Sequence, residues 1–293
     1  MINATTKNRI AQLKADYDAI PSDRRSLLDL LTEREIPEMV YNSNAIENST
    51  LSLAETEAII FRNKTPNGAN VREVYEAKNL ANVLAFLEQH PAYTLTEPHI
   101  LELHQMLISG INNYIAGRFR DVGEHVRVGW HIAPAPEHIP VMVDDVLHSY
   151  NTSEAYFLDK IAQFHARFEY IHPFNDGNGR TGRILTNLQL RQLGYPPITI
   201  FAKNREKDYY PLFEEYQRTR RYDGFTELFA KLLCESLHKR LAYAEGGEVI
   251  KLSEWARRHD QDMNALLNAA RRQSIPAFRE RGVWMVPANW ERY

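Results

Sequence analysis

The sequence predicts a mainly α-helical bundle with one short β-hairpin, followed by a small helix-turn-helix-like domain at the C-terminal end. Three observations support this prediction. Apolar residues recur at steps of three and four over several long segments, which is the spacing of one apolar helix face. One segment alternates with a period of two, as a β-strand does. The charge balance also changes after Gly246-Gly247, which indicates a domain boundary there.

The composition excludes several classes of protein. The 293 residues carry 44% hydrophobic and 25% charged side chains, with a formal net charge of −3. These ordinary globular values exclude a disordered, collagenous or strongly basic chain. Cys234 is the single cysteine, so no internal disulfide can form. The N-terminal residues are polar, and no window approaches the roughly 20 apolar residues of a membrane-spanning helix. We therefore expect a cytoplasmic protein that does not contact a membrane.

The helical spacing recurs along the chain. It is present in four segments: 71–87, 100–108, 161–171 and 184–193. Thr94-Leu95-Thr96-Glu97 has the pattern of a capping box, and Pro98 is tolerated in the first turn that follows it. Gly194, with two prolines shortly after it, is a typical helix stop.

The period-two segment runs from Val126 to Ile132. It predicts a strand, or a tight hairpin bent at Gly129. Three prolines follow within a few residues, and they disfavour a long sheet there. Trp130 and His131 belong to this segment and are candidates either for packing or for contact with a target chain.

The most informative segment is residues 172–183, with the sequence HPFNDGNGRTGR. Glycines allow unusual backbone angles, so that backbone N–H groups can point at a bound anion. The segment has three of them, Gly177, Gly179 and Gly182. A helical pattern follows, and the N-terminus of a helix also favours an anion. The segment therefore predicts an anion-binding loop.

Four side chains add chemistry to this loop. Arg180 and Arg183 carry guanidinium groups that match phosphate oxygens, and Asp176 supplies the hard oxygen ligand that Mg²⁺ prefers. His172 precedes them and can accept a proton near neutral pH. Together they predict phosphoryl or nucleotidyl transfer.

Two other interpretations of the glycines are weaker. The spacing G-x-G-x-x-G also occurs in dinucleotide-binding folds, but there a strand precedes it, whereas the pattern over 161–171 is helical. No P-loop sequence is present. A glycine-rich turn with a solvated basic face is the alternative without function.

Residues 172–183 resemble the signature H-P-F-x-[D/E]-G-N-G-R-x-x-R of the Fic family at every specified position. Gly117-Arg118-Phe119-Arg120, Val126-Arg127-Val128 and Pro134-Ala135-Pro136 resemble the region that forms the family's flap. The resemblance covers roughly residues 40 to 220. It implies the helical Fic fold, with a β-hairpin flap that aligns a segment of the target protein beside the loop.

The resemblance also implies an activity, which is the transfer of AMP from ATP to a Ser, Thr or Tyr hydroxyl of a target protein (AMPylation). His172 would be the general base, and Asp176 would hold Mg²⁺ on the phosphates. Arg180 would bind a phosphate, and Arg183 would bind the γ-phosphate. The anion hole would be formed by Gly177, Asn178 and Gly179, with Asn178 also touching phosphate.

An upstream segment, Ser43-Asn44-Ala45-Ile46-Glu47-Asn48, resembles the family's inhibitory pattern [S/T]-x-x-x-E-[G/N]. Its position implies the subclass with an N-terminal inhibitory helix, here at about residues 38–48. Ser43 and Glu47 are four residues apart and share one helix face. A Glu47 paired bidentately with Arg183 would occupy the group that the γ-phosphate needs. The alternative is that Glu47 is an ordinary surface acid.

The C-terminal tail is basic. Residues 251–293 contain eight Lys or Arg against five Asp or Glu, a net charge of +3. Leu252-Ser253-Glu254 and Ile275-Pro276-Ala277 resemble an excisionase-type winged helix-turn-helix, although Gln273-Ser274 stands where that family has a glycine. Arg271 and Arg272 lie on the candidate recognition helix and could contact DNA phosphates. A protein-docking module is the alternative.

We therefore expect three regions: an N-terminal helical region with the inhibitory helix over 1–92, a Fic catalytic core over 93–245, and a small helix-turn-helix-like domain over 248–293. Two other functions stay open. The same site could remove AMP from a modified protein, with Glu47 orienting water, or the chain could be an ATP-responsive DNA-binding regulator. Self-association into a homodimer is expected by analogy with the subclass.

Overall fold

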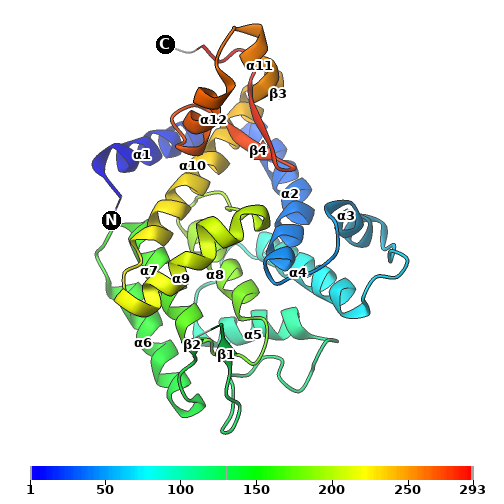
Figure 1. The fold of residues 1–293 in the computed structure, drawn as a ribbon, viewed down its shortest axis with the longest axis vertical. Helices are drawn as coiled ribbons and strands as arrows, with labels where there is room; N and C mark the ends of the chain where they lie inside the picture. The colour runs from blue at the N-terminus through cyan, green and yellow to red at the C-terminus, as the bar shows by residue number, and fades with distance from the viewer. Residues whose placement is uncertain (1, 130, 292–293) are drawn as a thin grey trace. The chain divides into compact units, whose positions relative to one another are not determined.

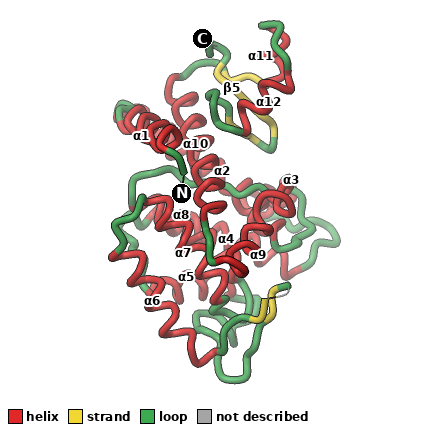
Figure 2. The backbone as a smooth tube through the Cα atoms, turned by 60° about the vertical axis from the view of Figure 1, so that its left-hand side comes forward, coloured by secondary structure: helices red, strands yellow, loops and turns green. Residues whose placement is uncertain are grey.

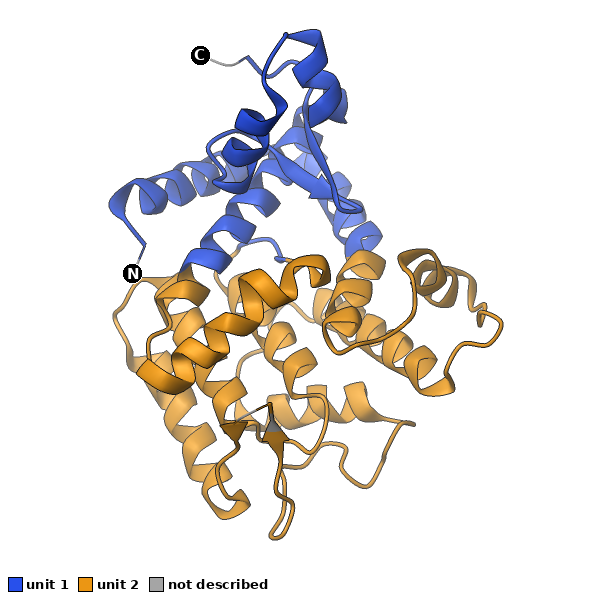
Figure 3. Ribbon diagram, in the orientation of Figure 1, with its two compact units in different colours: residues 1–35, 195–198, 227–293 blue, residues 36–194, 199–226 orange. Residues whose placement is uncertain are grey.

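The structure is a computed structural model that describes residues 2–129 and 131–291, and it confirms the mainly helical prediction (Figures 1 and 2). The chain divides into two compact units (Figure 3). The large unit comprises residues 36–194 and 199–226, and the terminal unit comprises residues 1–35, 195–198 and 227–293. The predicted anion-binding loop and the inhibitory segment both belong to the large unit.

The large unit is a helical bundle. It contains the C-terminal part of α2 (Arg25–Ile46), then α3 (Leu53–Arg62), α4 (Val71–Gln89), α5 (Glu97–Ile108), α6 (Ile139–Thr152), α7 (Phe157–Ile171), α8 (Asn178–Gln192) and α9 (Tyr210–Thr219). Short helical turns cover Pro136–His138, Ala202–Asn204 and Arg205–Tyr209. Helix α7 packs against α6 and α8, and α4 packs against α5 and α8. One continuous apolar core joins these helices and includes Phe174 of the predicted loop.

The predicted helix over 100–108 is present as α5, but its start differs from the prediction. Thr96, and not Thr94, is the N-cap residue, and its side chain accepts a hydrogen bond from the His99 N–H. A start at Thr94 would place Pro98 where the first intrahelical N–H must donate, and proline has none. Thr96 as the cap leaves Pro98 in the first turn, where no donor is needed.

The hairpin at the period-two segment is confirmed. Strand β1 (Arg127–Val128) pairs antiparallel with β2 (His131–Ile132), and Gly129 between them has φ +57°. Trp130 lies outside the described residues. His131 hydrogen-bonds the Tyr170 carbonyl of α7 through Nε2 at 2.7 Å, so the hairpin is attached to the helix that leads into the predicted loop.

The terminal unit combines helices with a small sheet. Its helices are α1 (Ala4–Asp18), the N-terminal part of α2, most of α10 (Asp223–Glu245), α11 (Leu252–Arg258) and α12 (Met263–Arg271), with a short turn at Ser22–Arg24. Strands β3 (Val249–Lys251), β4 (Phe278–Glu280) and β5 (Val283–Pro287) form an antiparallel sheet in the order β3-β5-β4. Helix α11 packs against α12 and β5.

The boundary expected near Gly246-Gly247 falls inside the terminal unit. Helix α10, which precedes it, makes several polar contacts with the tail, among them a hydrogen bond from the Tyr243 hydroxyl to Glu280 at 2.8 Å. Glu235 forms an ion pair with Arg279 at 2.6 Å, and His238 Nδ1 lies 2.9 Å from Gln273 Oε1. These contacts link the tail to α10 within one compact unit, and the division into three regions stays a prediction of the sequence.

Among the described residues, no helix has both the length and the apolar composition needed to cross a membrane.

Candidate active site

The predicted anion-binding loop connects α7 to α8, and left-handed residues mark both of its ends. His172 is the C-cap of α7 with φ +50°, and Gly177 is the N-cap of α8 with φ +80°. A Cβ atom at Gly177 would come 2.9 Å from Ile108 Cδ1, so the backbone angle and the lack of space both require glycine. Left-handed backbone is uncommon at a non-glycine residue and is often found at functional sites.

Asn178 and Phe174 hold the loop in this shape. The Asn178 side chain accepts a hydrogen bond from the Phe174 N–H at 2.8 Å and donates one to the Phe174 carbonyl at 2.7 Å. The Phe174 ring is fully buried, as expected of a core anchor. The Asn178 side chain is thus engaged within the loop, and the predicted contact of Asn178 with phosphate is left to its backbone N–H.

His104 of α5 connects the loop to Gly117, in the segment that precedes the hairpin. Its ring stacks on Phe174 with the centroids 3.6 Å apart. Its Nδ1 accepts from the Gly117 N–H at 3.1 Å, so its Nε2 donates to the Asp176 carbonyl at 3.0 Å. Burial lowers the pKa of His104 to about 4, which keeps the ring neutral as this bonding requires.

The bonding of His172 leaves one ring nitrogen available as an acceptor. Its Nδ1 lies 3.3 Å from the Glu169 carbonyl oxygen, to which a neutral ring donates, and Nε2 then carries the lone pair. Burial lowers the pKa of His172 to about 4, so the ring is unprotonated at neutral pH. A neutral imidazole with its Nε2 lone pair available is the form that accepts a proton.

Arg120, from the segment that resembles the flap region, supports the loop from the other side. Its buried guanidinium donates to the carbonyls of His172 and Pro134 at 2.9 Å each and of Glu124 at 2.8 Å. Its backbone N–H donates to the Pro173 carbonyl at 2.9 Å. The Arg120 side chain therefore joins both ends of the hairpin segment to the backbone of His172.

We expect Arg120→Lys to lower the free energy of unfolding by about 2–3 kcal/mol, because an ammonium group cannot reach three carbonyls held by a planar fork. Arg118→Lys in the same motif is the matched control. Its guanidinium binds the partly exposed Glu124 carboxylate, and a loss of at most about 1 kcal/mol is expected. Urea unfolding measures both values, and equal losses for the two variants would contradict the role given to Arg120.

The predicted contact of Glu47 with Arg183 is present. Arg183 donates from Nε to Ser43 Oγ at 2.9 Å, and from Nη2 to the Ser43 carbonyl at 2.9 Å and to Glu47 Oε1 at 2.8 Å. The sequence predicted a bidentate pairing, but Arg183 bonds only one oxygen of Glu47, and its Nε donates to Ser43 instead. Arg183 is only 8% exposed. The Glu47 carboxylate also lies against the loop, since a Cβ atom at Gly179 would collide with it.

The inhibitory segment is part of a longer helix than predicted. Helix α2 extends over Arg25–Ile46 with Pro37 inside it, and Glu47 lies in the turn directly after its last residue. Asn48 follows with φ +68°. The Tyr210 hydroxyl donates to the Ile46 carbonyl at 2.5 Å, so the segment after α8 holds the end of α2 beside Arg183.

Asp176 and Arg180 are both engaged in ion pairs. Arg180 lies 3.2 Å from Asp176 Oδ1 and 3.1 Å from Glu76 Oε1 of α4. Asp176 also binds Arg72 of α4. Although burial raises the pKa of Asp176, Arg180 and Arg72 lower it below its ordinary value, so the carboxyl group is ionised at neutral pH.

A buried polar group behind Arg183 was not predicted. Burial raises the pKa of Glu169 to about 8, and one of its carboxyl oxygens has no hydrogen-bond partner. His165 Nε2 lies 2.8 Å from the Tyr209 hydroxyl. Tyr209 is buried against His165 and is not exposed to a ligand. These residues follow ordinary helical spacing, which gives no signal of their role.

We expect stability to fall as the pH is lowered from about 6.5 to 4. Burial lowers the pKa of four histidines in the folded chain: to about 3 for His165 and to about 4 for His104, His172 and His238. The ordinary value in an unfolded chain is about 6.5, so the unfolded chain binds more protons in this window and is favoured there.

The check is the melting temperature between pH 4 and pH 8. His238→Gln should reduce the loss on the acid side, whereas His148→Gln, at an exposed position, should leave it unchanged. A melting temperature that is constant from pH 6.5 to 4.5 would contradict the burial of these neutral rings.

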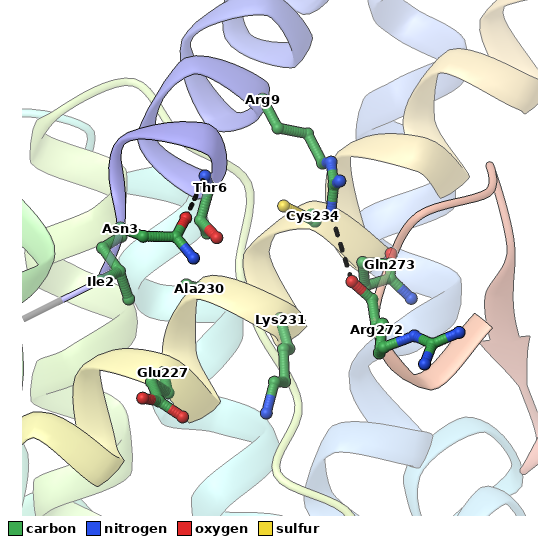
Figure 4. Close-up of a pocket in the computed structure, with 10 residues that line it drawn as sticks. All are labelled: Ile2, Asn3, Thr6, Arg9, Glu227, Ala230, Lys231, Cys234, Arg272 and Gln273. Atoms are coloured by element: carbon green, nitrogen blue, oxygen red, sulfur yellow. Dashed lines mark hydrogen bonds between the residues drawn. The ribbon is translucent and has the colours of Figure 1, made fainter. Parts of the chain in front are cut away.

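One cavity of about 290 Å³ lies elsewhere, in the terminal unit, between α1, α10 and the end of α12 (Figure 4). Arg9 donates to the Arg272 carbonyl across it at 3.2 Å. Figure 4 shows the charged ends of Lys231 and Arg272 directed away from Cys234. Burial raises the pKa of the Cys234 thiol to about 11, which makes it a poor nucleophile.

The fold and the loop define a class of protein. Residues 94–190 match the model of the Fic/DOC family. This part of the chain is a Fic domain, and its helices α5 to α8 carry the hairpin and the loop described above.

Named relatives agree with this class. The chain is 29% identical to "Protein adenylyltransferase Fic" of Aedes aegypti over 211 residues, which cover 69% of this chain and 42% of that protein. It is 33% identical to the protein of the same name from Nematostella vectensis over 177 residues, which cover 58% of this chain and 41% of that protein. The chain thus spans less than half the length of these relatives.

Solved structures agree on the fold. A Fic domain containing signaling protein from Bacteroides thetaiotaomicron superposes with a TM-score of 0.74 at 23% identity, covering 82% of this chain and 98% of that one. At that identity the similarity concerns the fold alone. Within the large unit, the structure brings together the predicted site residues of the loop and of the inhibitory segment.

Proposed function

We propose that this chain is a protein adenylyltransferase that Glu47 holds inactive. It transfers AMP from ATP to a hydroxyl group of a target protein. The observation that carries the proposal is that Glu47 and Ser43 bind Arg183 in the first turns of α8. The loop that leads into this helix begins with a buried, neutral His172. The names of the related proteins support transfer of AMP over its removal, and over the DNA-binding regulator.

The chemistry follows from the loop. His172 Nε2 accepts the proton of the target hydroxyl, and the oxygen attacks the α-phosphorus of ATP. The bond from the α-phosphorus to the oxygen that bridges to the β-phosphate breaks, and pyrophosphate leaves. The N-terminus of α8, with the backbone N–H groups of Asn178 and Gly179, stabilises the negative charge on the phosphates, whereas the Gly177 N–H donates to Asp176 Oδ1.

Asp176 would hold Mg²⁺. Its carboxylate is a hard oxygen ligand, which fits this ion. Among the described residues, no group of three or more acidic, histidine or cysteine side chains gathers around a metal position. This agrees with an ion that is bound by one carboxylate, phosphate oxygens and water, as is common for Mg²⁺ with nucleotides. When bound, the ion neutralises charge on the departing pyrophosphate.

The inhibition has a direct physical basis. Arg183 is the group proposed to bind the γ-phosphate, and Glu47 and Ser43 take its donors. A triphosphate that cannot use Arg183 is not held with its α-phosphate in line with the attacking oxygen, and in-line geometry is what the loop must provide. The Glu47 side chain is 42% exposed, so a modest change of free energy is enough to release it.

The test uses ATP labelled at two positions with the Glu47→Gly variant and Mg²⁺. Label from the α-phosphate is expected to become covalently attached to protein, and label from the γ-phosphate is not. A kinase would give the reverse pattern, and attachment of neither label would contradict the proposal.

Further properties of the chain stay predictions of the sequence: a homodimer, a cytoplasmic location and DNA binding through residues 248–293. The structure bears on the last of these only in part. Arg279 is paired with Glu235 and is held against the Trp284 ring. Arg271 and Arg272 of the candidate recognition helix are exposed. These two residues are therefore accessible for a phosphate contact, as are Lys251, Arg257, Arg258 and Arg281 elsewhere in the tail.

A further inference from the structure

The first turn of α4 carries a side chain that reaches the proposed metal ligand. Arg72 forms an ion pair with Asp176, which is 104 positions away in the sequence, through Asp176 Oδ2. The other oxygen, Oδ1, accepts from the Gly177 N–H at 2.6 Å and lies 3.2 Å from Arg180 Nη2. Both oxygens of the carboxylate are thus already engaged by donors.

Glu76 completes a ring of alternating charges with these residues. Its Oε1 lies 3.0 Å from Arg72 Nε and 3.1 Å from Arg180 Nη1. The ring contains two cations and two anions, so it is neutral. It joins α4 to the loop, and α4 lies outside residues 94–190, which the family model matches.

The two arginines of this ring differ in burial. The Arg180 side chain is 3% exposed and is fixed between Asp176 and Glu76. The Arg72 side chain is 53% exposed, and it is long and flexible enough to move into solvent. A cation that approaches Asp176 from solvent therefore meets Arg72, and Arg72 is the member of the ring that can leave at low cost.

A guanidinium group and a divalent cation cannot both occupy the same carboxylate oxygen, because their charges repel and each needs the same lone pairs. We propose that Arg72 is a displaceable counter-cation of the metal site: it neutralises Asp176 before nucleotide binds, and a hard divalent cation must displace it. The proposal rests on the function proposed above, which makes Asp176 the metal ligand. Arg72 would thus regulate metal binding at Asp176, whereas Glu47 acts on Arg183, and the two effects are independent.

The test measures metal binding without turnover. In the Glu47→Gly/His172→Ala background, Mn²⁺ alone is titrated and the free ion is followed by electron paramagnetic resonance. Arg72→Gln removes the charge and keeps a polar, though shorter, side chain, and it is expected to lower the Kd for Mn²⁺ about two- to fivefold, the range of a half-exposed ion pair. Arg72→Ala should give the same result. Lys78→Ala removes one positive charge from the same helix and should leave the Kd unchanged.

A second measurement separates this inference from the function. In the Glu47→Gly background, Arg72→Gln is expected to shift half-saturation of AMP transfer to a Mg²⁺ concentration lower by a similar factor. Unchanged or weaker Mn²⁺ binding in Arg72→Gln and Arg72→Ala would overturn the inference, whatever the activity. Tighter Mn²⁺ binding with no AMP transfer in any variant would support the role of Arg72 and overturn the proposed function instead.

Discussion

Replacing Glu47 with glycine is expected to raise the rate of AMP incorporation at least about tenfold, because it frees the guanidinium that the γ-phosphate needs. A tenfold change corresponds to about 1.4 kcal/mol. A hydrogen bond between charged groups contributes about 1.5–3 kcal/mol, and the partial exposure of Glu47 reduces that value toward the lower end. The initial rate of label transfer from α-labelled ATP to protein measures the effect.

Two related variants calibrate this prediction. Glu47→Gln keeps an oxygen that can accept from Arg183 but removes the charge, so an intermediate rate is expected. Ser43→Ala removes the acceptor at 2.9 Å from Arg183 Nε and leaves Glu47 in place, so its rise should be smaller than that of Glu47→Gly. If wild type and Glu47→Gly incorporate AMP at the same rate, Glu47 is not inhibitory.

Replacing His172 with alanine in the Glu47→Gly background should lower the rate of transfer by a factor of about 10²–10⁴, the usual contribution of a general base. ATP affinity should change little, because the phosphates are bound by the loop and by the arginines rather than by the imidazole. Single-turnover kinetics give the rate, and calorimetric titration with ATP gives the affinity.

The exposed His148 provides the control for this second prediction, since His148→Ala should leave both values unchanged. Loss of rate together with loss of ATP affinity in His172→Ala would mean that the residue holds the loop in shape and is not the base. Retention of the rate would exclude His172 from the chemistry altogether.

Features encoded by neighbouring residues were predictable from the sequence. The helices α4, α5 and α7 follow from steps of three and four, and the hairpin follows from alternation around Gly129. The loop was recognisable because its acidic, basic and histidine side chains lie within residues 172–183. The pattern around Ser43 and Glu47 also predicted the contact with Arg183, although not its one-oxygen geometry.

Features that depend on distant parts of the chain were not predictable. Nothing in the helical spacing of α4 indicates that Arg72 and Glu76 meet the loop, because such pairs form only when two helices pack. The raised pKa of Glu169 likewise depends on burial behind Arg183. The tail after Gly246-Gly247 belongs to the same compact unit as most of α10, with contacts such as the ion pair between Glu235 and Arg279. The sequence shows only a change of charge there.

The most direct test of the account is the intact mass of purified Glu47→Gly protein after incubation with ATP and Mg²⁺, compared with the Glu47→Gly/His172→Ala double variant. The account predicts an added mass of one or more AMP groups in the first protein and none in the second. An equal mass shift in both proteins, or none in either, would contradict it.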